Sequence, residues 1–379
     1  MRSATTDQYA LARWRMENLG LGSTVQSSAA EVVHRLGAVQ AQDYGPAKWS
    51  VGERVNGVDV DRVGGDGVAG GGSILRTHLL RPTWHFVVPA DIRWLLALTA
   101  PRVHALNAYS YRQLELDEAV RGRSEELLAS ALVGHHLTRS EIATVLGQAG
   151  ITAADLRLGY ILMSAELNGL ICSGPRRGKQ HTYALLDERA PLMPSASALD
   201  RDEALGRLAH RYFTSHGPAT VKDCAYWSSL STTDVKRGLD TVDALVRETF
   251  DGVEYWFASC APPPLSASAR VHLLQGYDEF LVAYSESKYV LDASGAARSE
   301  PPRQGVFNHV LVLDGQVTGR WRRTQKKNSV VIEVAPYARL HPEATRALRD
   351  AATRHGRFLE LPATVLTRPR NPTDGRRSS

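Results

Sequence analysis

The sequence predicts an α+β chain in which three helical segments, each closed by a β-hairpin, precede a β-rich C-terminal segment. Two patterns support this class. Between residues 27 and 260, apolar residues at helical spacing are followed three times by paired strand signals. After a proline-rich break at 260–270, the pattern changes to alternating apolar residues around tight turns. The length of 379 residues also favours two or three compact units over one core.

The first segment contains two expected helices and a hairpin. Apolar residues of 27–39 share one helical face, behind serines that can cap the helix. A short helix is expected over 46–55, with a proline in its first turn. Residues 74–88 then indicate two strands that meet at Pro82. Helix, helix and hairpin is the order of a winged helix.

The same order recurs twice. Residues 137–151 and 155–171 are expected to be helices, the second of recognition-helix type, and 172–186 a basic hairpin that forms the wing. Residues 202–260 give a third, weaker copy, whose hairpin turns at an Asp-Gly pair. Three such modules in tandem favour duplex nucleic acid as the partner, because a helix and a basic wing fit the groove and the backbone.

The C-terminal segment is β-rich. Alternating apolar residues flank Asp314-Gly315 and predict a hairpin, residues 329–334 add a strand, and 341–361 indicate a helix followed by a strand. A short basic tail ends the chain and is expected to be disordered. The expected division is 1–115, 116–195, 196–265 and 266–368, with the tail over 369–379.

Composition excludes several protein classes. A content of 43% hydrophobic and 22% charged residues is that of a soluble globular protein. No apolar run approaches the ~20 residues that span a bilayer, and the N-terminus lacks an apolar signal core, so we expect no membrane contact. Three distant cysteines, Cys172, Cys224 and Cys260, predict buried free thiols. The histidines show no ligand spacing, and we expect neither a metal nor another cofactor.

One glycine pattern is weighed and set aside. Residues 63–73 contain a formal GxGxxG at Gly65, Gly67 and Gly70. A dinucleotide-binding loop needs a strand before it and a helix after it, whereas here a polar segment precedes and a strand-like run follows. A flexible linker is the preferred interpretation.

The positive charge is clustered. The net charge is only +5, which solubility alone can explain. Two groups of basic residues are nevertheless candidate contacts to DNA phosphates, with a solvated charged loop as the alternative for each. The candidates are Arg176, Arg177 and Lys179 in one loop, and Arg320, Arg322, Arg323, Lys326 and Lys327 in another.

The stretch QAQ at 40–42 raises a separate question. Gln40 and Gln42 lie between two expected helices, and from the residues alone the simpler interpretation is two solvated glutamines near a helix end. On a helix, residues i and i+2 point about 200° apart. In extended or turn backbone they share a face, and the following Gly45-Pro46 permits such a backbone.

Long blocks of this chain resemble the AlkZ/YcaQ-type DNA glycosylases, and the resemblance covers roughly residues 8–365. It implies three winged helices and a C-terminal β-barrel around a DNA-sized channel. The blocks are GAVQAQDYGPAKWSVGERV (37–55), RTHLLRPTWHFVVPADIRWLLALTAPRV (76–103), YILMSAELNGLICSGPRRGKQHTYALL (160–186), RYFTSHGPATVKDCAYWSSL (211–230) and GVFNHVLVLDGQVTGRWRR (305–323).

The resemblance implies a catalytic pair. The family signature is Gln, an apolar residue, then Gln or Asp, so that Gln40-Ala41-Gln42 has the AlkZ form. The family's substrates are alkylated purines, especially N7-modified guanine, and in some members bulky adducts or interstrand crosslinks. An N7-alkylguanine already carries positive charge and leaves readily. Two amide oxygens can then position water and stabilise an oxocarbenium-like transition state through fixed dipoles.

Further residues near the pair are candidates for support. Strand alternation places Thr83 and His85 on one side of their strand, where His85 can contact a phosphate or the water; a hydrogen-bonded structural histidine is the alternative. Asp43 can support the pair or cap the next helix. Asp278-Glu279 is a tempting general base, and a structural role is preferred.

The predicted function follows from these features. We expect a monofunctional DNA glycosylase, a cytoplasmic and nucleoid-associated monomer, that acts on double-stranded DNA carrying an alkylated purine in base excision repair or genotoxin self-resistance. No lysine stands out as a Schiff-base nucleophile. The alternative is a non-catalytic winged-helix DNA-binding protein or transcriptional regulator, which would prefer a particular duplex sequence.

Overall fold

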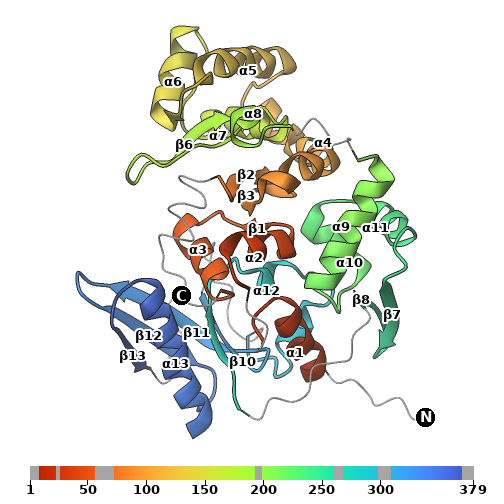
Figure 1. The fold of residues 1–379 in the computed structure, drawn as a ribbon, viewed down its shortest axis with the longest axis vertical. Coiled ribbons are helices and arrows are strands. Elements are labelled where there is room, and N and C mark those ends of the chain that lie inside the picture. The colour runs from red at the N-terminus through yellow and green to blue at the C-terminus, as the bar shows by residue number, and fades with distance from the viewer. Residues whose placement is uncertain are drawn as a thin grey trace, which may run out of the picture.

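The protein is elongated, with a helical body at one end and a β-sheet at the other (Figure 1). The computed structural model describes residues 8–22, 26–55, 72–192, 199–258, 268–297 and 309–368. The GxGxxG of residues 65–70, Cys260 and the tail lie outside the described residues. Cys172 and Cys224 are buried and free, as predicted.

The first segment contains a three-stranded sheet, order β1-β3-β2. The Ser28 side chain accepts the Glu31 N–H and caps α2, as predicted. The prediction that the two strands meet at Pro82 is wrong, because the turn is at Leu80 (φ 61°) and Pro82 lies inside β3 at a register shift, where its missing N–H costs no ladder bond. The elements are α1 (Gln8–Asn18), α2 (Ala29–Leu36), β1 (Val39–Gln40), α3 (Tyr44–Gly52), β2 (Leu75–Leu79) and β3 (Arg81–Val87).

The second segment is mainly helical and carries its own core. The helices expected over 137–151 and 155–171 are α6 and α7, and the basic hairpin is β5–β6. Thr138 and Glu141 form a capping box that starts α6. The elements are α4 (Pro89–Gln113), α5 (Glu118–Leu132), β4 (Leu137–Thr138), α6 (Arg139–Gln148), α7 (Asp155–Leu167), β5 (Ile171–Ser173), β6 (Thr182–Leu185) and α8 (Leu186–Arg189).

The third segment has the predicted order of three helices and a hairpin. The hairpin turns at Asp251-Gly252, both with positive φ, as a tight two-residue turn requires. The elements are α9 (Arg201–Ser215), α10 (Val221–Ser228), α11 (Thr232–Leu239), β7 (Leu245–Phe250) and β8 (Val253–Ala258). The order of elements in all three segments agrees with winged helices, while that assignment and the segment boundaries stay predictions.

The C-terminal segment is a five-stranded sheet, order β13-β12-β11-β10-β9, with the predicted turn at Asp314-Gly315. Within the described ranges it is an open sheet and not the expected barrel, because β9 and β13 each pair with one strand only. The elements are β9 (Val271–Leu274), α12 (Glu279–Val282), a 3-10 helix (Lys288–Leu291), β10 (His309–Leu313), β11 (Gln316–Gln325), β12 (Val330–Pro336), α13 (Pro342–Phe358) and β13 (Ala363–Thr367).

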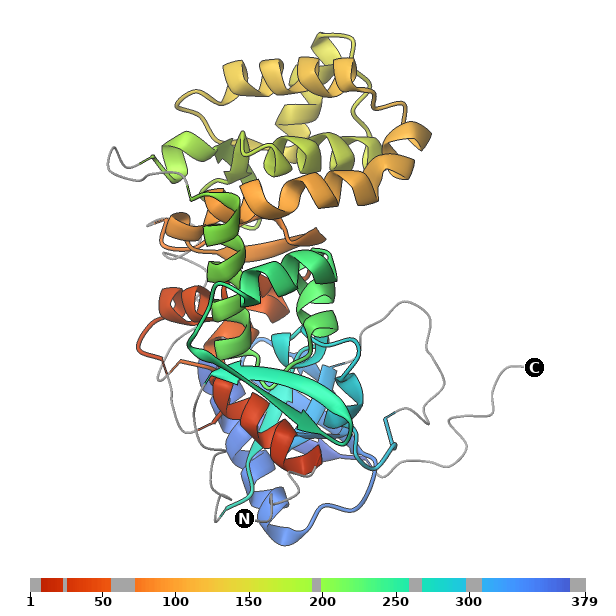
Figure 2. The ribbon, with the colours of Figure 1, turned by 90° about the vertical axis from the view of Figure 1, so that its right-hand side faces the viewer.

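The buried residues divide the molecule into two main bodies. One large core joins the first, third and C-terminal segments and includes the first half of α4 together with Cys172 and Leu186, whereas the rest of the second segment packs around a separate cluster. Figure 2 shows α4 between α7 and the β2–β3 strands, and α4 contacts both. The QAQ stretch therefore belongs to the larger body. None of the helices that the structure describes is long and apolar enough to cross a bilayer.

Candidate active site

The QAQ stretch lies at the edge of the first sheet. β1 is antiparallel to β3, with Gln40 opposite His85, and the pairing continues where the Ala41 N–H donates to the Trp84 carbonyl at 2.7 Å. The chain then bends and enters α3 at Tyr44. Gln40 is therefore in a strand and Gln42 in the bend that follows it, so that the helical alternative does not apply, and extended or turn backbone is what the structure has at these positions.

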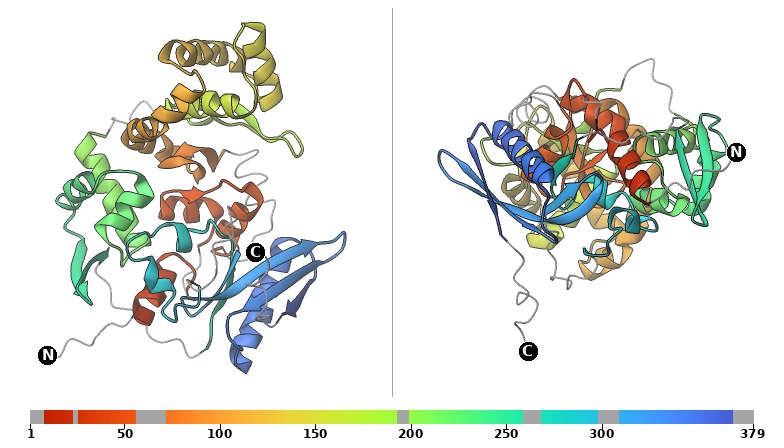
Figure 3. Two further views of the ribbon diagram at one scale, coloured as in Figure 1. Left: turned by 180° about the vertical axis from the view of Figure 1, so that it is seen from behind. Right: turned by 90° about the horizontal axis from the view of Figure 1, so that it is seen from below.

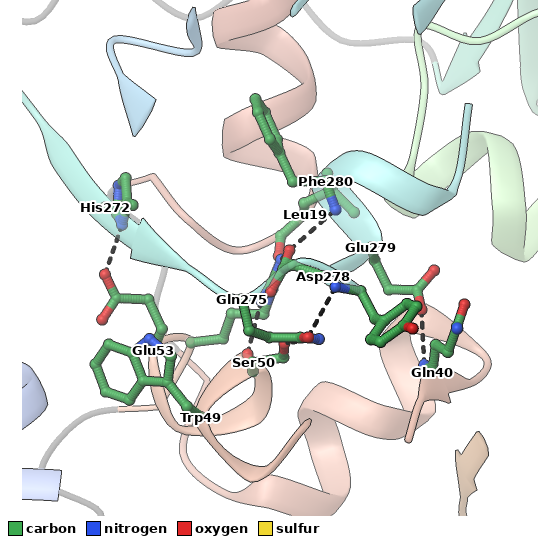
Figure 4. Close-up of polar contacts among 12 residues, drawn as sticks. Leu19, Gln40, Trp49, Ser50, Glu53, His272, Gln275, Asp278, Glu279 and Phe280 are labelled. Carbon is green, nitrogen blue, oxygen red and sulfur yellow. Dashed lines mark hydrogen bonds and ion pairs between the residues drawn. The ribbon is translucent and has the colours of Figure 1, made fainter. Parts of the chain in front are cut away.

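Gln40 is held at both its backbone and its side chain, and is only 6% exposed. Its backbone N–H donates to Glu279 Oε1 at 2.8 Å, a contact visible in Figure 4. Its side-chain Oε1 accepts from Arg81 Nη2 at 2.9 Å. One contact comes from α12 and the other from the start of β3, so that the position of Gln40 depends on segments about 40 and 240 residues away in the chain.

Glu279 is a fully buried carboxylate with several partners. Its Oε2 accepts from Trp227 Nε1 at 2.8 Å and lies 3.7 Å from His216 Nε2. Burial alone would raise the pKa of Glu279, but His216, the Arg81 charge and the Gln40 N–H stabilise the carboxylate and lower its pKa to about 2. A group that remains ionised and fully engaged in this way is poorly suited to take a proton from water.

Its neighbour Asp278 is equally buried and binds Arg54 with both carboxylate oxygens, at 2.7 and 2.9 Å. The same side chain accepts the Phe280 N–H and starts α12. Figure 4 shows Asp278 and Glu279 side by side at the start of this short helix. The geometry agrees with the structural role preferred for this acidic pair.

Gln42 and Asp43 are exposed, in contrast to Gln40. Gln42 Oε1 accepts the backbone N–H of Trp84 at 3.3 Å, which places its side chain along β3. Asp43 is at the N-cap position of α3, yet its side chain makes no capping hydrogen bond. Its carboxylate is therefore not used for the capping role that was considered for it.

Thr83 and His85 occupy the adjoining strand. His85 is opposite Gln40, and paired residues of an antiparallel ladder share a face of the sheet. His85 Nδ1 lies 2.9 Å from the Thr83 carbonyl, while His85 Nε2 and Thr83 Oγ1 are buried with no hydrogen-bond partner in the described part of the chain. Burial and the Arg81 charge lower the pKa of His85 to about 3, so the ring is neutral at physiological pH.

A cluster of aromatic and cationic side chains borders the glutamines. The Arg76 guanidinium lies 4.3 Å from the Trp84 ring and donates to the Ala41 carbonyl at 3.1 Å. Tyr44 packs edge-on against His181 from the β5–β6 hairpin, with ring centroids 4.7 Å apart. The β5–β6 hairpin is thus packed onto the first turn of α3.

One residue of each basic cluster reaches this region. Arg176 lies over the Tyr44 ring, 4.9 Å from its centroid. For Arg323 on β11, burial lowers the pKa of the guanidinium, and the negative charge of Asp43 opposes that shift. Figures 1 and 3 show the β5–β6 hairpin, α3 and one end of the C-terminal sheet on the same side of the molecule.

The second basic cluster was predicted to lie in a loop. This prediction is wrong, because three of its arginines are on β11. Alternation along that strand places Arg323 on the face of buried Trp321, where Arg323 Nη1 lies 3.2 Å from His355 Nε2. Arg320 is half-buried on the same strand. The remaining candidates, all exposed, are Arg177 (2.7 Å from Glu141), Lys179, Arg322 (2.8 Å from Glu333), Lys326 and Lys327.

Comparison with known proteins decides the family. The model of the DNA glycosylase AlkZ-like family matches residues 33–358. The chain belongs to the AlkZ-like DNA glycosylases. It is 28% identical over 327 residues to an interstrand DNA cross-link repair glycosylase of Streptomyces sahachiroi, which covers 81% of this chain and 85% of that protein. The predicted family and enzyme class are therefore confirmed.

The fold of this AlkZ-like chain agrees with a solved relative. The structure of the Streptomyces sahachiroi DNA glycosylase AlkZ superposes with a TM-score of 0.77 at 24% identity, over 97% of this chain and 100% of that one. Among the described residues there is no group of three or more His, Cys, Asp or Glu side chains placed to hold a metal ion.

Two contacts of this AlkZ-like site were not anticipated from the sequence. Arg81 was not singled out, although strand alternation from Thr83 and His85 places it on their face of β3. Glu279 was considered, but its bond to the Gln40 backbone joins residues 239 positions apart, and no local pattern indicates it. The first contact had a signal in the sequence and the second had none.

Proposed function

We propose that this DNA glycosylase hydrolyses the N-glycosidic bond of N7-alkylated guanine, with Gln40 and Gln42 as the catalytic pair. The observation that supports the proposal best is the fixed position of Gln40 beside an exposed Gln42 just before α3, whose first residue, Tyr44, lies under Arg176. Polar groups held in place before the reaction stabilise a transition state without paying for reorganisation.

The proposed reaction needs little acid–base chemistry. Water oxygen forms a bond to C1′ of the sugar, and the bond from C1′ to N9 breaks. Its electron pair neutralises the cationic base, and the proton of the water passes to solvent. Amide groups orient the water and stabilise the developing positive charge, and the carboxylate that contacts Gln40, that of Glu279, is engaged in hydrogen bonds rather than available as a base.

The basic residues are proposed to hold DNA phosphates. Arg176 lies over Tyr44, the first residue of α3, and the exposed Lys179, Lys326 and Lys327 extend the positive surface along the β5–β6 hairpin and the β11–β12 turn. Such contacts position the duplex without reading its sequence. The relative named for interstrand cross-link repair makes crosslinked and bulky N7 adducts substrates to be tested alongside N7-methylguanine.

The experiment is base release from defined duplexes. DNA carrying one N7-methylguanine, one bulky N7 adduct or one N7-linked crosslink is incubated with excess protein, and free base and alkali-labile sites are measured over time. We expect release above the spontaneous rate from at least one of these duplexes, and abasic DNA that remains unbroken before alkali. Spontaneous rates for all three would contradict the proposal.

Substitutions test the catalytic pair. Gln42→Ala is expected to lower the single-turnover rate by about 10²-fold, the usual effect of losing one fixed polar contact to a transition state. The dissociation constant for lesion duplex should stay within about threefold, since the change removes no positive charge. Gln148→Ala, an exposed glutamine on α6, is the matched control and should leave the rate unchanged. A Gln42→Ala rate equal to this control would argue against the assignment.

A further inference from the structure

We propose that Arg81 is a positioning residue that divides the work of the two glutamines. It holds the carboxamide of Gln40 with its oxygen turned toward the guanidinium, so that Gln40 serves as a hydrogen-bond donor through its NH2 group and Gln42 supplies the acceptor oxygen. This inference rests on the proposed function, because it assigns separate roles within the same site.

The orientation of the Gln40 carboxamide follows from the donor inventory. Arg81 Nη2 donates to Gln40 Oε1 at 2.9 Å. A guanidinium has only donors, and the carboxamide has donors at its nitrogen end, so the flipped carboxamide would bring N–H against N–H. The contact therefore fixes which end of Gln40 points toward Arg81, and leaves the NH2 group as the end that Arg81 does not hold.

Arg81 is itself fixed in place. Its other terminal nitrogen, Nη1, donates to the Val282 carbonyl at 3.0 Å, at the end of α12. Its guanidinium also lies 5.8 Å from the ring centroid of Tyr226. Burial lowers the pKa of Arg81 and the Glu279 charge raises it. The group stays a cation, because arginine in proteins does not lose its proton.

The charge of Arg81 then separates the roles. A cation 2.9 Å from Gln40 Oε1 opposes any use of that oxygen to stabilise an oxocarbenium-like sugar, which is also positive. The Gln42 oxygen accepts only from the Trp84 backbone N–H at 3.3 Å within the described residues, and a carbonyl oxygen has a second lone pair. Gln42 can therefore accept from the water, while the Gln40 NH2 group donates to the water oxygen.

Carboxylate substitutions test the division directly. A glutamate at either position keeps the acceptor and loses the donor. Gln42→Glu should retain the single-turnover rate within about tenfold, while Gln40→Glu should lose about 10²-fold, as much as Gln40→Ala. Equal losses at both positions, or a larger loss at Gln42, would overturn the inference. Circular dichroism and thermal melting confirm that each variant is folded.

A double-mutant cycle tests whether Arg81 acts through Gln40. Arg81→Met should lower the single-turnover rate at saturating lesion duplex by about tenfold or more, and Arg81→Lys should restore part of it. In the Gln40→Ala background the same Arg81→Met change should have no further effect, because the group it positions is gone. An unchanged rate in Arg81→Met, or full additivity with Gln40→Ala, would refute the positioning role.

The control and the wild-type protein separate the possible failures. Arg93→Met removes an arginine that likewise donates to a backbone carbonyl, that of Ala190, outside the candidate site, and should leave the rate unchanged. If the wild-type protein releases no base from any duplex, the proposed function itself is wrong. If it releases base while the Arg81 and glutamate variants behave otherwise than expected, only the division of roles is wrong.

Discussion

Replacing Glu279 with glutamine should destabilise the protein and loosen β1, the strand that carries Gln40. The carboxylate accepts one hydrogen bond on each oxygen, from the Gln40 N–H at 2.8 Å and from Trp227 Nε1 at 2.8 Å. A carboxamide offers one oxygen and one NH2 group, so it can satisfy only one of these two buried donors. An unsatisfied buried N–H costs about 1–3 kcal/mol, which is the destabilisation expected for Glu279→Gln.

Glu279→Ala should cost more, about 3–5 kcal/mol, because both donors lose their partner and the buried Arg81 loses a nearby negative charge. Unfolding in urea, followed by tryptophan fluorescence, measures both variants. Glu141→Gln is the matched control: its carboxylate also has a pKa lowered to about 2, by the Thr138 backbone and by Arg177, but it is exposed and its glutamine can still cap α6. The control should stay within about 0.5 kcal/mol of wild type.

The pH dependence supplies a second measurement. The pKa of Glu279 is lowered to about 2 in the folded protein from a usual value of 4.5, so its stabilisation is complete above pH 4.5 and is lost as the pH falls toward 2. The stability difference between wild type and Glu279→Gln should therefore shrink between pH 5 and pH 3. Wild-type stability in both Glu279 variants, or a difference that grows on acidification, would refute the assignment.

Three further outcomes follow from the contacts described. Arg176→Ala should weaken binding to undamaged duplex and reduce the slope of log K against log salt by about one, with a smaller effect for the carboxylate-paired Arg177→Ala, as measured by fluorescence anisotropy at several salt concentrations. The pKa of His85, lowered to about 3, predicts no ionisation of this ring in the rate profile between pH 5 and 9; a transition near pH 6.5 that disappears in His85→Gln would contradict this. Burial raises the pKa of Cys172 to about 12 and also raises that of Cys224, so peptide mapping should find both thiols unlabelled by iodoacetamide at pH 8 until the protein is unfolded.

Local patterns predicted the elements well because each has a local cause. The turn at Asp314-Gly315 and the hairpin at Asp251-Gly252 depend on residues that adopt positive φ at little cost. At the glutamine pair the sequence permitted extended or turn backbone, and the structure has Gln40 in a strand and Gln42 in a bend. Predictions failed where the pairing of strands determines the structure. Pro82 lies within β3 because a register shift leaves this position without a partner residue, so its missing N–H breaks no hydrogen bond of the ladder.

The barrel expected for the C-terminal segment shows a different limit. Strand signals identify strands but not whether the first and last of them pair. In the described structure β13 joins the sheet parallel to β12 after the return of α13, which places it at an edge of the sheet and leaves β9 at the other. The resemblance to a family gave the expectation of closure, and the pairing of the described strands did not confirm it.

The candidate site could be found from the sequence only as a motif, because its geometry is assembled from distant segments. Gln40 is oriented by Arg81 at the start of β3 and by Glu279 on α12, and Glu279 is in turn held by Trp227 on α10. Arg81 belongs to the first segment itself, whereas Glu279 and Trp227 come from the C-terminal and third segments, so the first segment supplies only part of what fixes its own glutamine. If the proposed role is right, this dependence explains how two ordinary amides can act there: amides stabilise a transition state only when they are held in advance, and the groups that hold Gln40 come from three segments of the chain.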